Sequence, residues 1–172
     1  MKNLLFNLIE PVWLVGLFTV AGVYINSNSR PLTMIYTVSL VVVDVVCLLS
    51  KQIAKYLFMK YGSLIPGTDK HYIPYLGIGE RPRECPYTSY GFPSGHSMLV
   101  MYYVAFLVVN GQTQHVGLIV SILFALTVMY SRVEVFHCHY PNQVVYGGII
   151  GVLLAYLVPA LWLLVISFYV LI

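Results

Sequence analysis

The sequence predicts an all-α, multi-pass membrane protein, a bundle of about five transmembrane helices. Hydrophobic residues make up 59 % of the 172 residues and charged residues only 9 %, and the mean hydropathy is +0.83. A soluble domain carries about 25 % charged residues, so this chain has too few charges to cover a surface that faces water. Its apolar residues are also gathered in five long stretches. Together these observations exclude an ordinary soluble enzyme.

Each of the five apolar stretches approaches the roughly 20 residues that a helix needs to cross a bilayer. The predicted spans are residues 4–25, 32–49, 97–109, 116–130 and 141–172. The last stretch is long for one span and short for two, and Pro159 predicts a kink or a partial sixth helix. The apolar N-terminus has no cleavage site of small residues, so we expect it to remain as the first span. The length predicts one membrane domain over residues 1–172.

Polar connections alternate with the spans. The connections at residues 26–31 and 110–115 are short turns, whereas residues 51–93 and 131–140 form longer polar segments. If the five spans alternate in direction, both polar segments and the N-terminus lie on one face of the membrane. We therefore expect the functional residues to meet at one end of the bundle. The net charge of +3 is small and spread over the connections, which argues against a nucleic-acid partner.

Three polar clusters in these segments carry groups suited to phosphoryl transfer. They read GERPR at residues 79–83, FPSGHS at residues 92–97, and YSR and HYPNQ at residues 130–132 and 139–143. Arginine guanidinium groups bind phosphate oxygens in pairs. A helix that starts at the serine-glycine pair offers free N–H groups and a positive dipole end to an anion. One histidine can attack phosphorus while another protonates the leaving oxygen.

In this order the clusters resemble the motifs of the type 2 phosphatidic acid phosphatase superfamily, which run K-x6-R-P, P-S-G-H and S-R-x5-H-x3-D. The superfamily includes lipid phosphate phosphatases, dolichyl and undecaprenyl diphosphatases, glucose-6-phosphatase and vanadium haloperoxidases. The resemblance covers about residues 81–148. It implies a helical membrane bundle and hydrolysis through a phosphohistidine, with no metal ion or other cofactor.

The resemblance assigns a role to each matching residue. His139 would be the nucleophile that forms the phosphohistidine, and His96 would be the general acid for the leaving group. Gln143 stands where most of the superfamily has aspartate, and its amide oxygen would orient the imidazole. Glutamine at this position is similar to the dolichyl diphosphatase and glucose-6-phosphatase branches. The phosphate would be bound by groups from all three clusters and by a lysine: Arg81, Ser94, Gly95, Arg132 and Lys55.

The motif lysine is displaced in this chain. Seven residues before Arg81 stands Pro74 rather than a lysine. The segment KQIAKYLF closes the second span, where the superfamily's lysine usually lies, and an insertion after it would explain the longer distance to Arg81. We favour Lys55 from this segment as the phosphate-binding lysine, with Lys51 and Lys70 as alternatives.

The nucleophile is shifted by one residue. The pattern S-R-x5-H places the histidine at Cys138, between His137 and His139. We choose His139 because the following HYPNQVVYGG matches the superfamily's next helix, and His137 remains the alternative. The extra residue then has to be accommodated in the connection after Arg132. Because Cys85 lies in the other polar segment, a disulfide with Cys138 is an option beside two free thiols.

The sequence therefore predicts metal-independent hydrolysis of a lipid phosphate or diphosphate. An isoprenoid, dolichyl-type diphosphate is the favoured substrate because of Gln143 and the short chain. The alternative is a catalytically degenerate relative that binds phospholipid head groups or scaffolds partners. In a eukaryotic cell the resemblance implies the endoplasmic reticulum or another endomembrane, with a lumenal site. The lysines on the site face indicate a cytosolic site instead, so the sequence leaves the orientation open.

Overall fold

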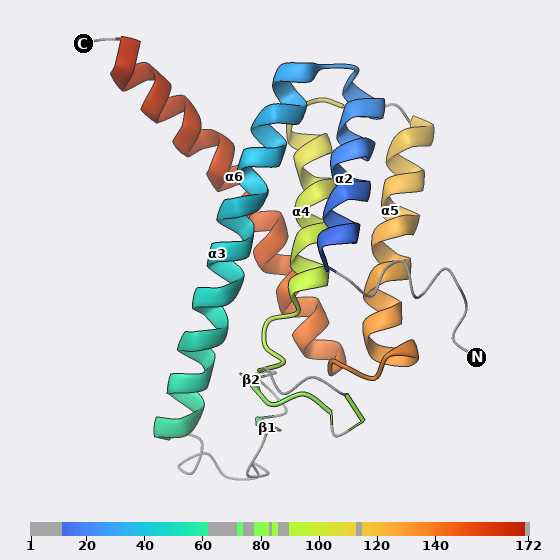
Figure 1. The fold of residues 1–172 in the computed structure, drawn as a ribbon, viewed down its shortest axis with the longest axis vertical. Helices are drawn as coiled ribbons and strands as arrows, with labels where there is room; N and C mark the ends of the chain where they lie inside the picture. The colour runs from blue at the N-terminus through green and yellow to red at the C-terminus, as the bar shows by residue number, and fades with distance from the viewer. Residues whose placement is uncertain are drawn as a thin grey trace.

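The computed structural model is a bundle of apolar helices and describes residues 12–61, 72–73, 78–82, 84–85, 90–112 and 115–170 (Figure 1). The helices are α2 (Val12–Ser27), α3 (Arg30–Tyr61), α4 (Gly95–Val109), α5 (His115–Tyr130) and α6 (Pro141–Val170). A π-helical turn, η2 (Ser131–Val135), follows α5, and β1 (Tyr72–Ile73) pairs with β2 (Ile78–Gly79) in antiparallel direction. Each predicted span thus coincides with one helix. The start of the first predicted span, residues 4–11, lies outside the described residues.

The lengths and composition of these helices are those of a membrane protein. Among the described residues, three segments are long and apolar enough to cross a membrane: Arg30–Tyr61, Val116–Val135 and Pro141–Trp162. The helices Val12–Ser27 and Gly95–Val109 are apolar but shorter. α6 runs as one helix through Pro159. The structure therefore has a single helix in the region for which the sequence left a kink or a partial sixth helix open. The prediction of an all-α, multi-pass membrane bundle is confirmed.

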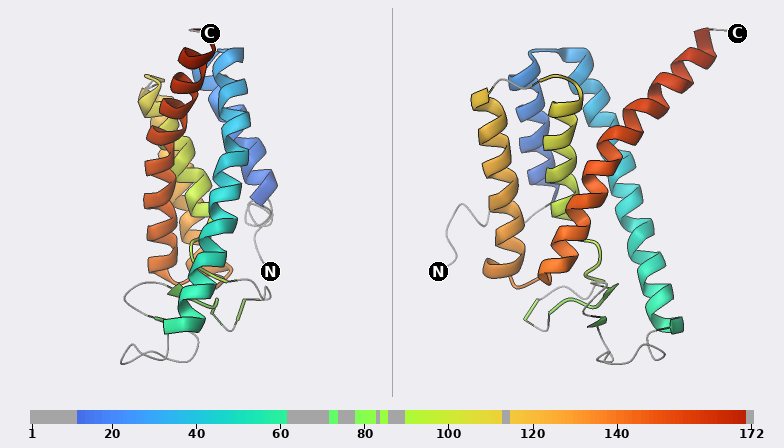
Figure 2. Two further views of the ribbon diagram at one scale, coloured as in Figure 1. Left: turned by 90° about the vertical axis from the view of Figure 1, so that its left-hand side faces the viewer. Right: turned by 180° about the vertical axis from the view of Figure 1, so that it is seen from behind.

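α4 lies at the centre of the bundle and contacts each of the other four helices (Figures 1 and 2). Its sequence, GHSMLVMYYVAFLVV, is apolar on nearly all sides, which is the pattern of a helix enclosed by others. Its buried residues include Leu99, Val100 and Phe106. The outer helices instead expose aliphatic side chains such as Leu48 and Leu157. The bundle therefore has a packed centre and an apolar exterior suited to lipid.

α4 and α6 pack with their backbones close together because glycines line the contact. A Cβ atom at Gly147 would lie 2.5 Å from the carbonyl oxygen of Ser94, and one at Gly151 would overlap the carbonyl oxygen of Met98. Glycines at this spacing within a span are typical of close helix packing in membranes. The start of α6 is therefore fixed against the start of α4, which brings the second and third polar clusters together.

The polar segments gather at one end of the bundle. The short connections at residues 28–29 and 110–112 lie at the upper end in Figure 1, whereas β1, β2, η2 and the starts of α4 and α6 lie at the lower end. Figure 2 shows the same separation from two further directions. α3 extends past the starts of α4 and α6 at the lower end (Figure 1). All three polar clusters thus meet on one face, as the alternation of spans predicts.

Candidate active site

His139 lies in the short loop between η2 and α6 and is buried, with 2 % of its surface exposed. The backbone of Arg132 holds this loop, because its carbonyl oxygen accepts hydrogen bonds from the N–H groups of Cys138 (3.0 Å) and His139 (3.2 Å). Arg132 is itself buried, and its guanidinium lies over the ring of Phe136, 4.9 Å from the ring centre. The arginine and the histidine of the third cluster are thus fixed as one unit.

The backbone takes up the extra residue between Arg132 and His139. The N–H of Phe136 donates to the carbonyl oxygen of Ser131 at 2.9 Å. This π-helical bond closes a turn with one residue more than an α-helical turn. His137 then has a positive φ of 48° and an exposed side chain. The histidine that faces inward is therefore His139, whereas His137 faces the solvent.

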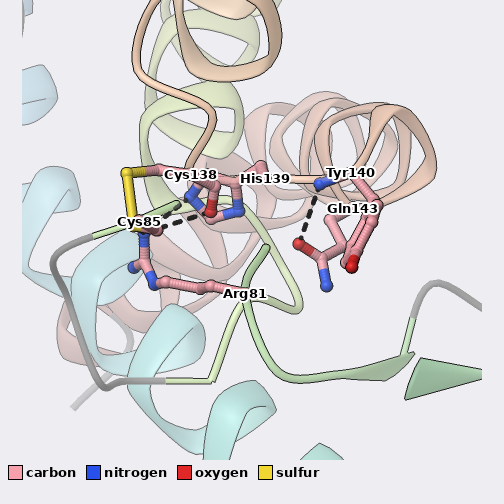
Figure 3. The surroundings of a disulfide bond; sticks show 6 residues. All are labelled: Arg81, Cys85, Cys138, His139, Tyr140 and Gln143. Atoms are coloured by element: carbon pink, nitrogen blue, oxygen red, sulfur yellow. Dashed lines mark hydrogen bonds between the residues drawn. A yellow bond between two sulfur atoms is a disulfide. The ribbon is translucent and has the colours of Figure 1, made fainter. Parts of the chain in front are cut away.

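Arg81 reaches His139 from a segment 58 residues earlier in the chain. Its Nη1 atom lies 3.2 Å from Nε2 of His139 and donates to the carbonyl oxygen of Cys138 at 3.4 Å (Figure 3). A guanidinium group only donates hydrogen bonds, so Nε2 is the acceptor here. The proton of a neutral His139 ring consequently lies on Nδ1, and the Nε2 lone pair faces the arginine.

A disulfide joins the two segments that carry Arg81 and His139. Cys85 and Cys138 are bonded, with their Cα atoms 4.6 Å apart. Nη1 of Arg81 also lies 3.8 Å from Sγ of Cys85 (Figure 3). The third cysteine of the chain, Cys47, is buried and free. The structure thus settles the pairing that the sequence left open.

The surroundings of His139 keep its imidazole neutral. Burial lowers the pKa of His139 well below the ordinary value, and the positive charges of Arg81, Arg132, Lys51 and His96 lower it further, in that order. A ring cation would be buried beside these groups, so the ring retains its lone pair at neutral pH. Within the part of the chain that is described, no group forms a hydrogen bond with Nδ1. The result is a buried neutral imidazole among cations, whose charge an anion could balance.

The same electrostatic surroundings single out Lys51 rather than Lys55. Lys51 is half-buried and acts on His139, whereas Lys55 is exposed and does not belong to the charges that lower the pKa of His139. The reason is geometric. Lys55 lies roughly one turn, about 5.4 Å, farther along α3, toward the end of this helix at Tyr61. Lys70 lies outside the described residues, so the structure brings Lys51, not the favoured Lys55, to the site.

The second cluster forms the start of α4. Ser94 is the N-cap residue, and its Oγ accepts from the N–H of Ser97 (3.5 Å) and from Oγ of Ser97 (2.9 Å). Both bonds use the oxygen as acceptor, so the hydroxyl proton of Ser94 is left to donate. A Cβ atom at Gly95 would lie 3.1 Å from Sγ of Cys47, so glycine lets α4 approach α3 closely. His96 is half-buried and close enough to the buried histidine to lower its pKa.

Gln143 has other partners than the ring it was expected to orient. Its Oε1 accepts from the N–H of Tyr140 at 3.2 Å (Figure 3), and its Nε2 donates to the carbonyl oxygen of Glu80 at 3.3 Å. The first bond is a capping interaction by the third residue of α6. The second ties α6 to the segment that carries Arg81. Because both ends of the amide are engaged, the expected hydrogen bond from Gln143 to the ring of His139 is not formed.

The sequence alone did not single out Lys51 or the disulfide, although each left a signal. Lys51 follows Cys47 by four residues, and residues at this spacing share one face of a helix. Since Cys47 packs against the start of α4, the face that carries Lys51 is turned toward the site. For the disulfide, the signal was that Cys138 lies in one polar segment and Cys85 in the other, and both segments were expected on the same face of the membrane.

A comparison with known proteins agrees with this fold. The family model of the PAP2 superfamily matches residues 32–166, more than half of the chain. No curated protein and no solved structure matches the chain. The chain belongs to the PAP2 superfamily, so the resemblance predicted from its motifs is confirmed. Membership implies a membrane-embedded phosphatase that acts on phosphate esters.

Proposed function

We propose that this protein hydrolyses a lipid phosphate or diphosphate through a covalent phosphohistidine on His139, without a metal ion. The observation that carries the proposal is the buried, neutral His139 with the guanidinium of Arg81 at its Nε2 atom. A neutral imidazole has the lone pair that a nucleophile needs. The cations around it supply the affinity for phosphate. The whole chain, residues 1–172, would act as one membrane domain.

In the first chemical step the phosphate displaces Nη1 of Arg81 from Nε2 of His139. It then accepts hydrogen bonds from the guanidinium groups of Arg81 and Arg132. Nε2 of His139 attacks phosphorus, an N–P bond forms, and the bond from phosphorus to the leaving oxygen of the lipid breaks. His96 donates its proton to that oxygen. In the second step His96 takes a proton from a water molecule that attacks phosphorus. The N–P bond then breaks, inorganic phosphate leaves, and His139 is neutral again.

Three sources of positive potential favour this reaction. Arg81, Arg132 and Lys51 carry full charges around the nucleophile. The start of α4 adds N–H groups and the positive end of its dipole, and the hydroxyl proton of Ser94 is left to donate. Donors that are already in place where charge develops lower the barrier without reorganisation. The fixed packing of α4 against α6 supplies that preorganisation.

An apolar groove supports a substrate with a lipid tail. The groove has a volume of about 300 Å³ between α4, α5 and α6, and Met129 and Ile149 are part of its lining. Met129 precedes Arg132 by three residues, so the groove begins within about one helical turn of the site. A substrate whose phosphate is held at His139 can place its tail along this groove. The preference for an isoprenoid tail rests on Gln143, the residue shared with the dolichyl-type branch.

Phosphate release by the purified, detergent-solubilised protein tests the proposal. Isoprenoid diphosphate, phosphatidate and glucose 6-phosphate are offered in excess chelator to the wild type, His139→Ala and His137→Ala. We expect the wild type and His137→Ala, but not His139→Ala, to release phosphate from a lipid substrate. Rapid quenching should trap a phosphoryl label on His139 that is labile in acid and stable in base.

Other outcomes of this assay would change the assignment. Glucose 6-phosphate as the best substrate would contradict a lipid substrate. Phosphatidate as the best substrate would keep the mechanism and replace the isoprenoid preference. A folded protein that releases no phosphate but binds phospholipid head groups would establish the catalytically degenerate alternative.

A further inference from the structure

We infer that the Cys85–Cys138 disulfide positions Arg81 for phosphate binding, so that the substrate affinity of the site depends on the oxidation of this pair. The inference rests on the proposed function, because it concerns the same site. The disulfide acts through Arg81 and is a positioning element rather than a catalytic one.

The two cysteines of the disulfide lie close in sequence to Arg81 and His139, the two residues that the disulfide would hold together. Cys138 is the residue before His139, and Cys85 follows Arg81 by four residues. Nη1 of Arg81 lies 3.8 Å from Sγ of Cys85, 3.4 Å from the carbonyl oxygen of Cys138 and 3.2 Å from Nε2 of His139 (Figure 3). The guanidinium is therefore in contact with both partners of the disulfide and with the nucleophile.

The disulfide is a covalent cross-link between the segment of Arg81 and the loop that carries His139. The strands before Arg81 pair only two residues each, and a two-stranded hairpin is marginally stable by itself. The carbonyl oxygen of Gly79 accepts from the N–H of Gly91 at 3.1 Å, and that of Glu80 accepts from Gln143 at 3.3 Å. These hydrogen bonds are weaker than a covalent bond. Opening the disulfide would therefore loosen the position of Arg81 while α4 and α6 stay packed.

Reduction opens this link with a defined chemical balance. A dithiol such as dithiothreitol transfers two electrons and two protons to the S–S bond, which yields two thiols, and becomes a cyclic disulfide itself. Cys85 is then free to move away from Cys138, and Arg81 loses its fixed distance to the phosphate site. A donor that must be ordered on binding contributes less affinity than one already in place. Partial loss of one charge-assisted contact predicts about tenfold weaker substrate binding.

The pH profile gives a second signature of this change. Arg81 is the first of the charges that lower the pKa of His139, and Arg132, Lys51 and His96 face the ring in addition. When Arg81 moves away, the pKa of His139 rises toward its ordinary value. The ring of His139 is then protonated at a higher pH, so the acid limb of the kcat/KM profile moves to higher pH. A general loss of folded protein would lower activity at all pH values without moving this limb.

The test compares the oxidised wild type, the reduced wild type and the variant Cys85→Ser/Cys138→Ser. Maleimide labelling under denaturing conditions reports the thiols: Cys47 alone in the oxidised protein and all three cysteines after reduction. KM, kcat and the pH profile come from phosphate release, and isothermal titration calorimetry gives the dissociation constant of inorganic phosphate. We expect reduction to raise KM and this dissociation constant about tenfold, with a smaller change in kcat. Reoxidation should restore both, and the variant should equal the reduced wild type and ignore dithiothreitol.

Each alternative outcome has a definite meaning. A fully reduced wild type that keeps its KM, phosphate affinity and pH profile would overturn the inference. So would reduction that melts the helices, measured by circular dichroism, because the disulfide would then serve folding rather than the site. If the double variant does not fold, reversible reduction of the wild type still decides. Weaker phosphate binding after reduction, in a protein that hydrolyses no substrate, would support the inference and contradict the proposed function. Hydrolysis of a lipid phosphate with a KM that reduction does not change would support the proposed function and contradict the inference.

Discussion

Alanine at Gly147 tests how closely the site depends on the contact between α4 and α6. A Cβ atom there would lie 2.5 Å from the carbonyl oxygen and 3.2 Å from the amide nitrogen of Ser94. Both are backbone atoms that cannot rotate away, so the two helices have to separate. Ordinary contact begins near 3.4 Å, which requires a shift of about 0.9 Å (3.4 minus 2.5). The hydrogen bond from the N–H of Ser94 to the carbonyl oxygen of Gln143, now 3.1 Å long, lengthens with it.

The cost of this shift appears in both stability and rate. Overpacking a tight contact destabilises a protein by roughly 1–3 kcal/mol, and weakening one hydrogen bond adds about 1 kcal/mol. We therefore expect Gly147→Ala to lose about 2–4 kcal/mol of unfolding free energy. The same displacement moves His96 relative to His139. A misplacement of about 1 Å can lower the rate about 100-fold, and we expect kcat to fall by about that factor.

Gly148→Ala is the matched control in the same helix. Its Cβ atom would meet side-chain atoms only, Cγ of Met101 at 3.2 Å and Cε of Met129 at 3.5 Å. Methionine side chains adapt at little cost, so this variant should stay within about 1 kcal/mol of the wild type. Thermal unfolding in detergent and phosphate release measure both variants. If Gly147→Ala were as stable and as active as Gly148→Ala, the close contact would not position the site and the reasoning would be refuted.

Three further predictions concern the charges and the groove of the site. Arg81→Gln removes a positive charge that lowers the pKa of His139, so this pKa rises and the acid limb of kcat/KM moves to higher pH; an unmoved limb would mean that Arg81 does not act on the ring. Lys51→Met should raise KM about tenfold, whereas Lys55→Met should change it less than about twofold, and equal KM values would reject the choice of lysine. Ile149→Trp, in the apolar groove, should raise KM for a long-chain lipid phosphate but not for a short-chain one. Ile119 is an exposed residue of α5, whereas Ile149 belongs to α6, so Ile119→Trp should leave KM unchanged for both the long-chain and the short-chain substrate. Equal effects of the two tryptophan substitutions on KM would argue against a tail in the groove.

The helices could be predicted because hydrophobicity in a membrane protein is a local property of the chain. Each apolar run of about 20 residues has to become a helix, since its backbone groups find no other hydrogen-bond partners in lipid. The predicted ends are less accurate for the same reason. α3 continues to Tyr61, past the predicted end of the second span at residue 49, because the segment after it is rich in helix-forming residues. Hydropathy reports where the lipid ends, not where the helix ends.

The site could be predicted in outline only, because its details depend on backbone geometry. The order of the motifs predicted that Arg81 and His139 belong to one site, and the two side chains lie 3.2 Å apart. The π-helical turn forms because the N–H of Phe136 donates to the carbonyl oxygen of Ser131. No residue type in the sequence determines which carbonyl oxygen accepts this hydrogen bond. One partner of Gln143, Tyr140, follows from capping at the third position of a helix. Its other partner, Glu80, lies 63 residues away, and no local pattern reveals it.

The disulfide also bears on the side of the membrane that the site faces. Disulfides persist in oxidising compartments and are rare in the cytosol, so the Cys85–Cys138 bond favours a lumenal or extracytoplasmic site. The lysines on the same face favour the cytosol, but Lys51 belongs to the site and therefore says little about orientation. We expect the oxidising side to hold the site. In sealed vesicles of known orientation, a membrane-impermeant maleimide added after reduction should label Cys85 only from that side. Labelling from the cytosolic side would show that the site faces the cytosol, a reducing compartment in which the disulfide would not persist.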